Sequence, residues 1–232
     1  MNILVVDIGG TNLKVSATGL DTIRKIPSGP DLTPEAMTGA VRAAVRDLSF
    51  DAVSIGYPGP VRRGHPSREP NNLKAGWVDF DYEKAFGRPV RIVNDAAMQA
   101  LGSYEGGEML FLGLGTGLGS ALVENGMLIP LELANLPYRK GRSYEDYLGT
   151  PGLERLGRKR WTRHVERVVA LFRFAMQAED IALGGGQTRK LTRIPEGVRI
   201  VPNSNAIIGG FRLWEIPDPR THLFSGVARP GL

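Results

Sequence analysis

An acidic residue followed by two glycines is the first feature of the chain that could do chemistry. Asp7 ends a short apolar run, and the turn after it contains Gly9, Gly10, Thr11, Asn12 and Lys14. Glycine lets backbone N–H groups come close to a phosphate, and a carboxylate beside such a turn commonly holds Mg²⁺ through water. Residues 7–14 therefore predict a turn that binds a phosphoryl donor, and we prefer this to an ordinary glycine hairpin with a solvent-facing Asp7.

A second glycine-rich loop alternates Gly113, Gly115, Gly117 and Gly119 with other residues, and Thr116 adds a hydroxyl inside it. The loop leads into a strand and not into a helix, so it is not a Rossmann fingerprint, and it lacks the Gly-Lys-Ser/Thr of a Walker A loop. Residues 184–186, with Gly185 at the centre, form a third cluster after a short apolar run. Three such clusters predict one phosphate-bearing ligand held from several sides.

Asp95 stands where a short apolar strand passes into a helix, directly after Asn94. A carboxylate at such a junction could take the proton of a hydroxyl group as that group attacks a phosphoryl group. The alternative is a plain helix N-cap, which either residue would serve well. The tetrapeptide 93–96 taken alone favours the cap.

The elements that must position these residues alternate along the chain. Strands are predicted at residues 3–6, 13–17, 22–26, 52–57, 89–93, 109–112, 117–123, 127–129, 181–183 and 198–201, and helices at 34–48 (capped by Thr33), 96–104, 159–177 and 205–213. Asn125 and Gly126 predict a tight hairpin turn. A meander followed by βαβ units, repeated once, predicts an α/β fold with two similar halves. We expect lobes at residues 1–107 and 108–216 and a tail at 217–232.

Composition excludes several classes of protein. The 232 residues include no cysteine, which excludes disulfides, thiolate zinc sites and cysteine nucleophiles. No apolar run reaches the roughly 18 residues of a membrane span, and the N-terminus lacks a signal peptide. We therefore expect a cytoplasmic protein with no membrane partner. The net charge of +5 favours anionic partners such as polyphosphate, phosphorylated metabolites or nucleic acid.

A basic stripe is predicted on the long helix at residues 159–177 and just before it. Arg155, Lys159, Arg163 and Arg167 recur at a spacing of four residues, which puts them on one helical face. A solvated face with interspersed glutamates is one interpretation, and a track for a polyanion is the other. Nucleic acid is not expected, because no aromatic residues interleave with the stripe.

Taken together and in order, the motifs resemble those of the ROK family of sugar kinases, and most of all its polyphosphate glucokinases. The resemblance covers roughly residues 2–214. It is carried by Asp7 to Thr11, Gly56 to Gly59, Asn71 with Asn72 and Leu73, Trp77, Asn94 to Ala96, Gly113 to Gly119, Glu132 with Leu133, and Gly184 to Gly186.

The resemblance implies an actin-like ATPase (ribonuclease H-like) fold with two lobes around a cleft. It implies that Asp95 is the general base and that the sugar is bound by Asn71, Asn72, Asn94, Glu132 and Glu145. The phosphoryl donor, ATP or polyphosphate, would lie on the turn at residues 7–14, on Gly115, Thr116 and Gly117, and near Gly185. Mg²⁺ would be held by Asp7, and a homodimer is left open.

Two departures from the family pattern stand out. The family's cysteine-rich zinc motif is absent, so no zinc is expected, and the polyphosphate branch lacks this motif too. The family's Glu-Leu-Gly-His becomes Glu132-Leu-Ala-Asn135, which removes a histidine that helps to form the sugar pocket. Because the phosphate turn begins at residue 7, we expect no N-terminal winged helix of the kind that ROK repressors carry.

Three functions compete at this point. The first is a kinase that moves a phosphoryl group from polyphosphate or ATP to a hexose, with the 6-hydroxyl of glucose as the expected acceptor. The second is a non-catalytic or regulatory sugar-binding protein of the same family. The third is a basic nucleic-acid-binding α/β domain. The retention of Asp7, Asp95 and both glycine loops favours the kinase.

Overall fold

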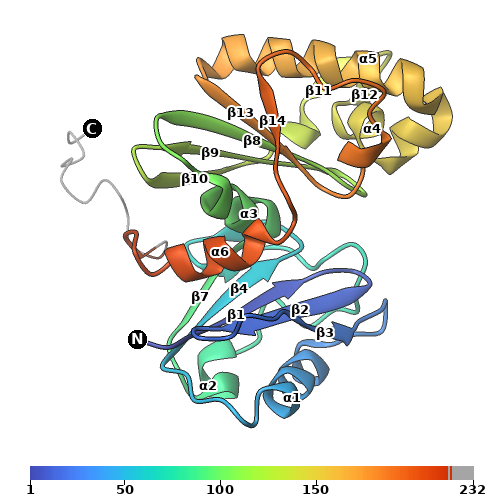
Figure 1. The fold of residues 1–232 in the computed structure, drawn as a ribbon. Helices are drawn as coiled ribbons and strands as arrows, with labels where there is room; N and C mark the ends of the chain where they lie inside the picture. Colours follow the sequence, from blue (N-terminus) through green and yellow to red (C-terminus); the bar gives the residue numbers. More distant parts are fainter. Residues whose placement is uncertain (219, 221–232) are drawn as a thin grey trace, which may run out of the picture. The chain divides into compact units, whose positions relative to one another are not determined.

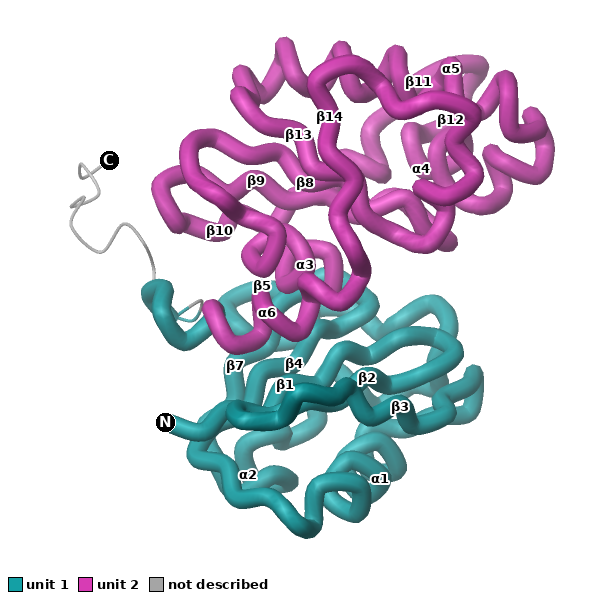
Figure 2. The backbone as a smooth tube through the Cα atoms, viewed as in Figure 1, with its two compact units in different colours: residues 1–94, 213–232 teal, residues 95–212 magenta. Residues whose placement is uncertain are grey.

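The computed structural model describes residues 1–218 and 220, which contain two five-stranded sheets (Figure 1). The chain forms two compact units (Figure 2). One comprises residues 1–94 and the described residues from 213 onward, and the other comprises residues 95–212. The tail expected at residues 217–232 falls mostly outside the described residues.

The first unit is built on a mixed sheet. Its strands are β1 (Ile3–Ile8), β2 (Asn12–Ala17), β3 (Arg24–Pro27), β4 (Ala52–Tyr57) and β7 (Val90–Asn94), in the order β3-β2-β1-β4-β7. The first three strands pair antiparallel, whereas β1, β4 and β7 pair in parallel. Every residue of β1 and β4 is buried, as expected for central parallel strands covered on both faces.

Smaller elements complete this unit. They are α1 (Pro34–Ala44), α2 (Tyr82–Phe86), and the short strands β5 (Val61–Arg62) and β6 (His65–Pro66). The predicted start of α1 is confirmed, because the Thr33 side chain accepts a hydrogen bond from the N–H of Ala36 and Pro34 opens the helix. Met37 and Val41 of α1 are fully buried in the core under the sheet.

The second unit repeats the plan. Its sheet contains β8 (Glu108–Leu114), β9 (Leu118–Glu124), β10 (Met127–Leu131), β13 (Asp180–Gly184) and β14 (Val198–Ile200), in the order β10-β9-β8-β13-β14. Three antiparallel strands are again followed by two parallel ones. Asn125 and Gly126 both have positive φ, so the predicted tight turn between β9 and β10 is confirmed. The prediction of two similar α/β halves is therefore confirmed as well.

Helices cover both faces of the second sheet. The helices are α3 (Asp95–Ser103), α4 (Glu145–Leu148), α5 (Thr150–Met176) and α6 (Asn205–Arg212), with 3-10 turns η1 (Leu133–Asn135) and η2 (Thr188–Lys190) and a hairpin of β11 (Pro137–Arg139) and β12 (Arg142–Ser143). Leu110, Leu112 and Leu114 of β8 pack against α5, including its buried Trp161 and Val165. Helix α3 packs against α6 and against β8 and β9.

The boundary expected at 107/108 does not coincide with the division between the two units. Helix α3 lies before that boundary in sequence but packs against α6, β8 and β9, so it belongs to the unit of residues 95–212. Conversely, residues 213–216 belong to the first unit. The Arg91 side chain of β7 donates hydrogen bonds to the carbonyls of Leu213 and Ile216, and the indole N–H of Trp214 donates to Ser54 Oγ of β4.

The predicted stripe of four cations on one helical face is wrong for Arg155. Helix α5 begins at Thr150, nine residues before the expected start at 159. It is broken at Gly157, whose φ of 71° and ψ of 158° are not helical. Lys159, Arg163 and Arg167 follow the break on one continuous segment, which ends at Met176, one residue before the predicted end at 177. Arg155 precedes the break and therefore does not continue their spacing.

Candidate active site

Asp7 is the next-to-last residue of β1 and is buried, with 6% of its surface exposed. The register of the sheet places it opposite Lys14 of β2, and Lys14 Nζ donates a hydrogen bond to Asp7 Oδ2 at 2.7 Å. A buried carboxylate needs such a partner, because its charge is no longer solvated by water. Two residues expected at the phosphoryl donor thus contact each other directly.

The turn after Asp7 is held in a fixed shape. The Gly9 N–H donates to the Asn12 carbonyl at 3.2 Å, and a Cβ on Gly9 would lie 2.7 Å from that oxygen, so only glycine fits. Ser28 donates from its hydroxyl to the Gly9 carbonyl at 2.6 Å and from its N–H to the Thr11 carbonyl at 3.0 Å. Nothing lies within 4 Å of the position of a Cβ on Gly10. The turn therefore has room for a ligand on a braced backbone.

Asn94, at the end of β7, is tied to the Pro-Gly turn that follows β4. Its side-chain amide donates to the Gly59 carbonyl at 3.1 Å. A Cβ on Gly59 would come within 2.8 Å of the Tyr57 ring, and the Tyr57 hydroxyl donates to the Arg68 carbonyl at 2.9 Å. Burial raises the pKa of Tyr57, so this hydroxyl stays protonated. The turn holds the side chain of Asn94 in place.

Asn71 and Asn72 are both exposed in a turn, and Glu69 closes the loop around them. The Glu69 carboxylate accepts hydrogen bonds from the backbone N–H groups of Gly76 at 3.1 Å, Trp77 at 3.0 Å and Val78 at 3.3 Å. The fully buried Trp77 side chain anchors the far end of this loop. Glu69 was not predicted from the sequence, and nothing in its local pattern distinguishes it from other exposed glutamates.

Asp95 is the first residue of α3, and its Oδ1 accepts a hydrogen bond from the Ala96 N–H at 2.8 Å. The start of α3 lies directly against the second glycine loop. A Cβ on Gly119 would come within 2.4 Å of the Ala96 Cβ, so the absence of a side chain at Gly119 permits this approach. The candidate base and the loop at residues 113–119 are therefore neighbours within one unit.

The loop itself is held by the junction of α4 and α5. The Thr150 N–H donates to the carbonyls of Gly115 at 3.2 Å and Thr116 at 3.0 Å, and its hydroxyl donates to Gly115 at 3.1 Å. Glu145 Oε2 accepts from the Leu118 N–H at 3.2 Å and occupies the space beside Gly117. Glu145, expected at the sugar, thus contacts the loop expected at the donor.

The Gly185 turn lies against the same loop. Its φ is +88°, and a Cβ there would lie 2.2 Å from the Leu114 carbonyl oxygen. Gln187 donates from its N–H to the Leu114 carbonyl at 2.9 Å and from its side chain to Thr150 Oγ1 at 3.0 Å. The Gly185 N–H donates to Asn203 Oδ1 at 3.0 Å. Two of the three predicted glycine clusters are thus brought together.

Three residues of this arrangement were missed by the sequence analysis, namely Thr150, Gln187 and Asn203. Thr150 is followed by Pro151, the same pattern that predicts the start of α1 at Thr33, so this signal was present. Gln187 and Asn203 act through contacts between segments far apart in the chain, and no local pattern indicates them.

Glu132 precedes η1, in a turn that Ser120 fastens to the sheet. The buried Ser120 hydroxyl donates to the Leu131 carbonyl at 2.9 Å and accepts from the Leu133 N–H at 3.2 Å. Asn135 donates from its side-chain amide to Glu132 Oε2 at 3.3 Å. The residue that replaces the family's histidine therefore contacts the carboxylate expected at the sugar.

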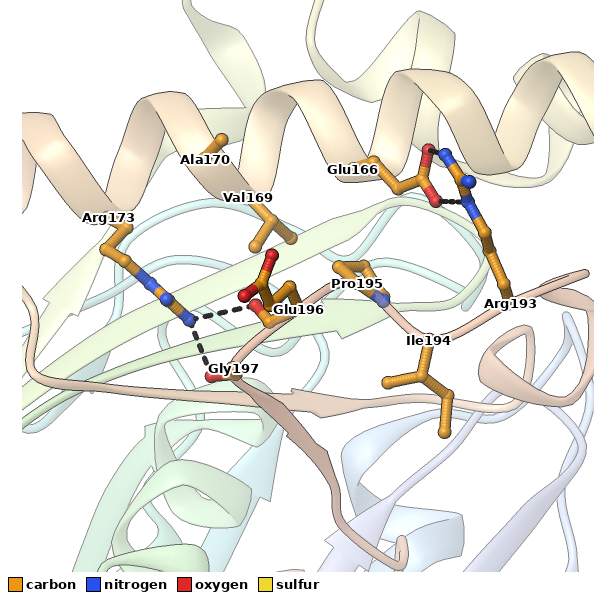
Figure 3. Close-up of a pocket in the computed structure, with 9 residues that line it drawn as sticks. All are labelled: Glu166, Val169, Ala170, Arg173, Arg193, Ile194, Pro195, Glu196 and Gly197. Atoms are coloured by element: carbon orange, nitrogen blue, oxygen red, sulfur yellow. Dashed lines mark hydrogen bonds and ion pairs between the residues drawn. The ribbon is translucent and has the colours of Figure 1, made fainter.

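A hollow of about 680 Å³ lies elsewhere on the second unit, between α5 and residues 193–197 (Figure 3). Glu166 forms an ion pair with Arg193 at one end of it, and Arg173 donates to backbone carbonyls at the other. None of the residues predicted for the site lines this hollow.

The described residues, 1–218 and 220, contain no group of three or more His, Asp or Glu side chains able to hold a metal ion together. Within the same residues, no helix has both the length and the apolar character required to cross a membrane.

Comparison with known proteins identifies the family. A model of the ROK family matches residues 3–130 of the chain. The chain belongs to the ROK family. The polyphosphate glucokinase of Mycobacterium leprae (strain TN) is 28% identical over 210 residues, covering 81% of this chain and 64% of the relative. The N-acetylmannosamine kinase of Escherichia coli O157:H7 is 33% identical over 145 residues, covering 56% and 50%. This ROK protein thus spans less than two thirds of either relative.

Solved structures support the fold. The inorganic polyphosphate/ATP-glucomannokinase from Arthrobacter sp. strain KM is 26% identical with a TM-score of 0.75, covering 90% of this chain and 96% of that one. A ROK family glucokinase from Streptomyces griseus, in complex with glucose and AMPPNP, has a TM-score of 0.73 at 17% identity, covering 92% and 99%. This ROK protein has the actin-like ATPase fold, and that prediction is confirmed.

Proposed function

We propose that this ROK protein is a sugar kinase that transfers a phosphoryl group from polyphosphate or ATP to a hexose, with the 6-hydroxyl of glucose as the acceptor. The observation that carries the proposal is the contact between the start of α3 and Gly119. It holds Asp95 beside the glycine loop, whose backbone is itself held by Thr150. Membership of the ROK family and the polyphosphate-using relatives support the same function.

In the proposed reaction, Asp95 accepts the proton of the sugar hydroxyl. The hydroxyl oxygen then forms a bond to the terminal phosphorus of the donor, and the bond from that phosphorus to the bridging oxygen breaks. The bridging oxygen leaves with the electron pair on the shortened donor. Backbone N–H groups of the glycine loops would bind the charged oxygens of the donor as charge develops there.

Polar side chains are the proposed ligands of the sugar. Asn71, Asn72 and Asn94 offer amide donors and acceptors, and Glu132 and Glu145 offer acceptors, which suits a ring of hydroxyl groups. The hydrogen bond from Asn135 to Glu132 distinguishes this chain at the turn proposed to bind the sugar, because the family has a histidine in place of Asn135. Discrimination among hexoses is therefore expected at this turn.

Mg²⁺ is the proposed cofactor. Asp7 supplies one buried carboxylate, and Lys14 forms an ion pair with one of its oxygens. A single carboxylate fits Mg²⁺ that takes its remaining ligands from water and donor phosphates, which is the usual way this ion is bound. When bound, Mg²⁺ would neutralise negative charge on the donor phosphates. Lys14 would share Asp7 with the ion and add a positive charge beside the donor.

The test is a panel of hexoses with ATP and with polyphosphate as donors, run on the wild type and on Asp95→Asn. Glucose with at least one donor should give a phosphorylated sugar. The variant should lose about 10²–10⁴-fold in turnover, the usual share of a general base, while its affinity for the sugar changes little. Near-normal turnover of Asp95→Asn would remove the base assignment. Sugar binding without transfer in the wild type would instead support the non-catalytic alternative.

A further inference from the structure

A group of exposed cations lies on the second unit around the half-buried His164. We call it the basic face, and it consists of Arg139 and Arg142 from the β11–β12 hairpin and Arg155, Lys159, Arg163 and Arg167 from α5. The hairpin and α5 are joined where the Tyr138 hydroxyl meets His164 Nδ1 at 3.0 Å. Burial lowers the pKa of His164, and the positive charges of Arg139, Arg167, Arg163 and Arg155 lower it further, so the ring lies in positively charged surroundings.

Some arginines elsewhere in the described residues pair with carboxylates, whereas others, such as Arg42 and Arg88, donate to backbone carbonyls. Arg24, Arg193, Arg199 and Arg220 form ion pairs with carboxylates. Within the part of the chain that the structure describes, none of the six cations of the basic face forms an ion pair. The nearby carboxylates have other partners, since Asp146 accepts hydrogen bonds from Ser143 and Glu166 pairs with Arg193. Without forming ion pairs with them, Asp146 lies within electrostatic range of Arg142 and Arg155, and Glu166 of Arg163, so the positive charge of the face is offset only in part.

The basic face begins next to the glycine loop. Helix α4 joins them, because Glu145 contacts Gly117 and Leu118 at its start, and the Tyr147 ring packs on His164 with ring centres 4.7 Å apart. Arg155 lies over the same Tyr147 ring and donates to the Asp146 carbonyl at 2.6 Å. Four helical residues extend only about 6 Å, so the basic face begins a short distance from the glycine loop.

We propose that the basic face binds the stretch of an inorganic polyphosphate chain that extends beyond the glycine loop. This inference rests on the proposed kinase function and specifies its donor. A long polyanion contacts the loop and several cations together, whereas the three phosphates of ATP are taken up at the loops. Nucleic acid fits less well, because Tyr144 and Tyr147 are 8% exposed and pack against Phe172 and His164, so neither of these two rings offers a face on which bases could stack.

The decisive measurement is direct binding of long-chain polyphosphate, by calorimetry without sugar, at several salt concentrations. The double variant Arg163→Gln with Arg167→Gln removes two cations from the exposed side of α5. In single-stranded nucleic acids, each phosphate contact adds about 0.7 to the steepness with which log affinity falls against log salt concentration. Loss of two contacts should therefore reduce the steepness measured for polyphosphate by roughly 1.4. At 0.1 M salt the same two contacts correspond to a loss of affinity of about 10- to 30-fold.

The matched control is Arg46→Gln with Lys84→Gln, which removes two exposed charges from the first unit. It should bind polyphosphate as the wild type does. Tripolyphosphate, too short to extend beyond the loop, should bind the wild type and the α5 variant equally. In turnover assays, the α5 variant should raise the KM for polyphosphate and leave the KM for ATP unchanged.

Three outcomes would overturn the inference. The first is that the α5 variant binds polyphosphate as tightly as the wild type does. The second is that the control variant loses as much affinity for polyphosphate as the α5 variant. The third is that single-stranded RNA competes for the protein as well as polyphosphate does at equal charge. The proposed function can fail separately. If the protein transfers a phosphoryl group from ATP but does not bind polyphosphate, only the role of the basic face is refuted. If it binds polyphosphate through Arg163 and Arg167 but phosphorylates no sugar, only the kinase function is refuted.

Discussion

Replacing Gly102 by alanine should loosen the helix that carries Asp95. Gly102 lies on α3 where it crosses α6, and an added Cβ would lie 1.8 Å from the Asn205 carbonyl oxygen and 2.5 Å from the Gly209 nitrogen. Both are backbone atoms, so no side chain can rotate away. To reach an ordinary contact distance of 3.4 Å, the two helices would have to separate by about 1.6 Å at this point.

The expected magnitude follows from two opposing contributions. Alanine stabilises a helix over glycine by about 1 kcal/mol. Forcing an extra methyl group into a packed contact costs typically 1–3 kcal/mol, and backbone neighbours put this position at or above the upper end. We expect a net loss of about 2–3 kcal/mol in the free energy of unfolding. At about 2–4 °C per kcal/mol for a chain of this size, Tm should fall by roughly 5–10 °C.

Gly39→Ala is the matched control. Gly39 lies in the middle of α1, and nothing lies within 4 Å of the position of its Cβ. Only the helix-propensity contribution remains, so this variant should gain about 0.5–1 kcal/mol and a few degrees in Tm. Calorimetry of both variants measures the two shifts, and if the units unfold separately, each variant should move only its own transition.

The two substitutions are thus expected to act with opposite sign, although both are Gly→Ala in a helix. Because α3 begins at Asp95, Gly102→Ala should also lower turnover at temperatures where the protein remains folded. A Tm for Gly102→Ala equal to or above that of the wild type would refute the reasoning. Gly209→Ala meets the Met98 carbonyl oxygen at 1.7 Å in the same crossing, so the double variant should lose less than the two single losses added.

Three further predictions concern other parts of the molecule. EDTA should abolish phosphoryl transfer and Mg²⁺ should restore it, and Asp7→Ala should be inactive yet folded by circular dichroism; full activity in EDTA would argue against the kinase. Glu69→Ala removes the acceptor of three N–H groups in the loop of Asn71 and Asn72, so steady-state kinetics should show a KM for the sugar that rises more than kcat falls; an unchanged KM would separate this loop from the sugar. Because its pKa is lowered in the folded state, His164 takes up a proton more readily when the chain is unfolded, so the free energy of unfolding should fall as the pH drops below about 6.5. Denaturant titrations at pH 5 and pH 7 should show a smaller difference for His164→Gln, and an equal difference would contradict the assignment.

Local patterns predicted the regular elements well where one physical signal dominates. The strand at residues 52–57 matches β4 at both ends, because Tyr57 is followed by Pro58 and Gly59, which end a strand sharply. The hairpin turn at Asn125 and Gly126 matches as well. The short elements β5, β6, α2, α4 and the β11–β12 hairpin were not predicted. The β11–β12 hairpin has no alternating pattern of its own and depends on the packing of Tyr138 against Tyr144, Tyr147 and His164.

The residues of the candidate site fall into the same two groups, those with a local sequence signal and those without one. Asp7, the glycine turns and Asp95 were located correctly at strand ends, since strand and turn signals are local. The position of Glu145 beside Gly117 could not be predicted, because the two residues belong to different elements and meet only when α4 packs on the loop. The break at Gly157 was missed for a different reason. A glycine is tolerated within a helix, and only its φ of 71° reveals the interruption.

The return of residues 213–216 to the first unit has a consequence for how the protein is made. Arg91 and Ser54 receive their partners Leu213, Trp214 and Ile216 only after all of residues 95–212 have been translated. At about 5–20 residues per second, that delay on the ribosome is roughly 6–24 s. During this time the nascent chain contains the strands of the first sheet but not yet residues 213–216, which pack against them. A chain terminated before residue 213 should be a better substrate for chaperones and proteases than the full-length protein.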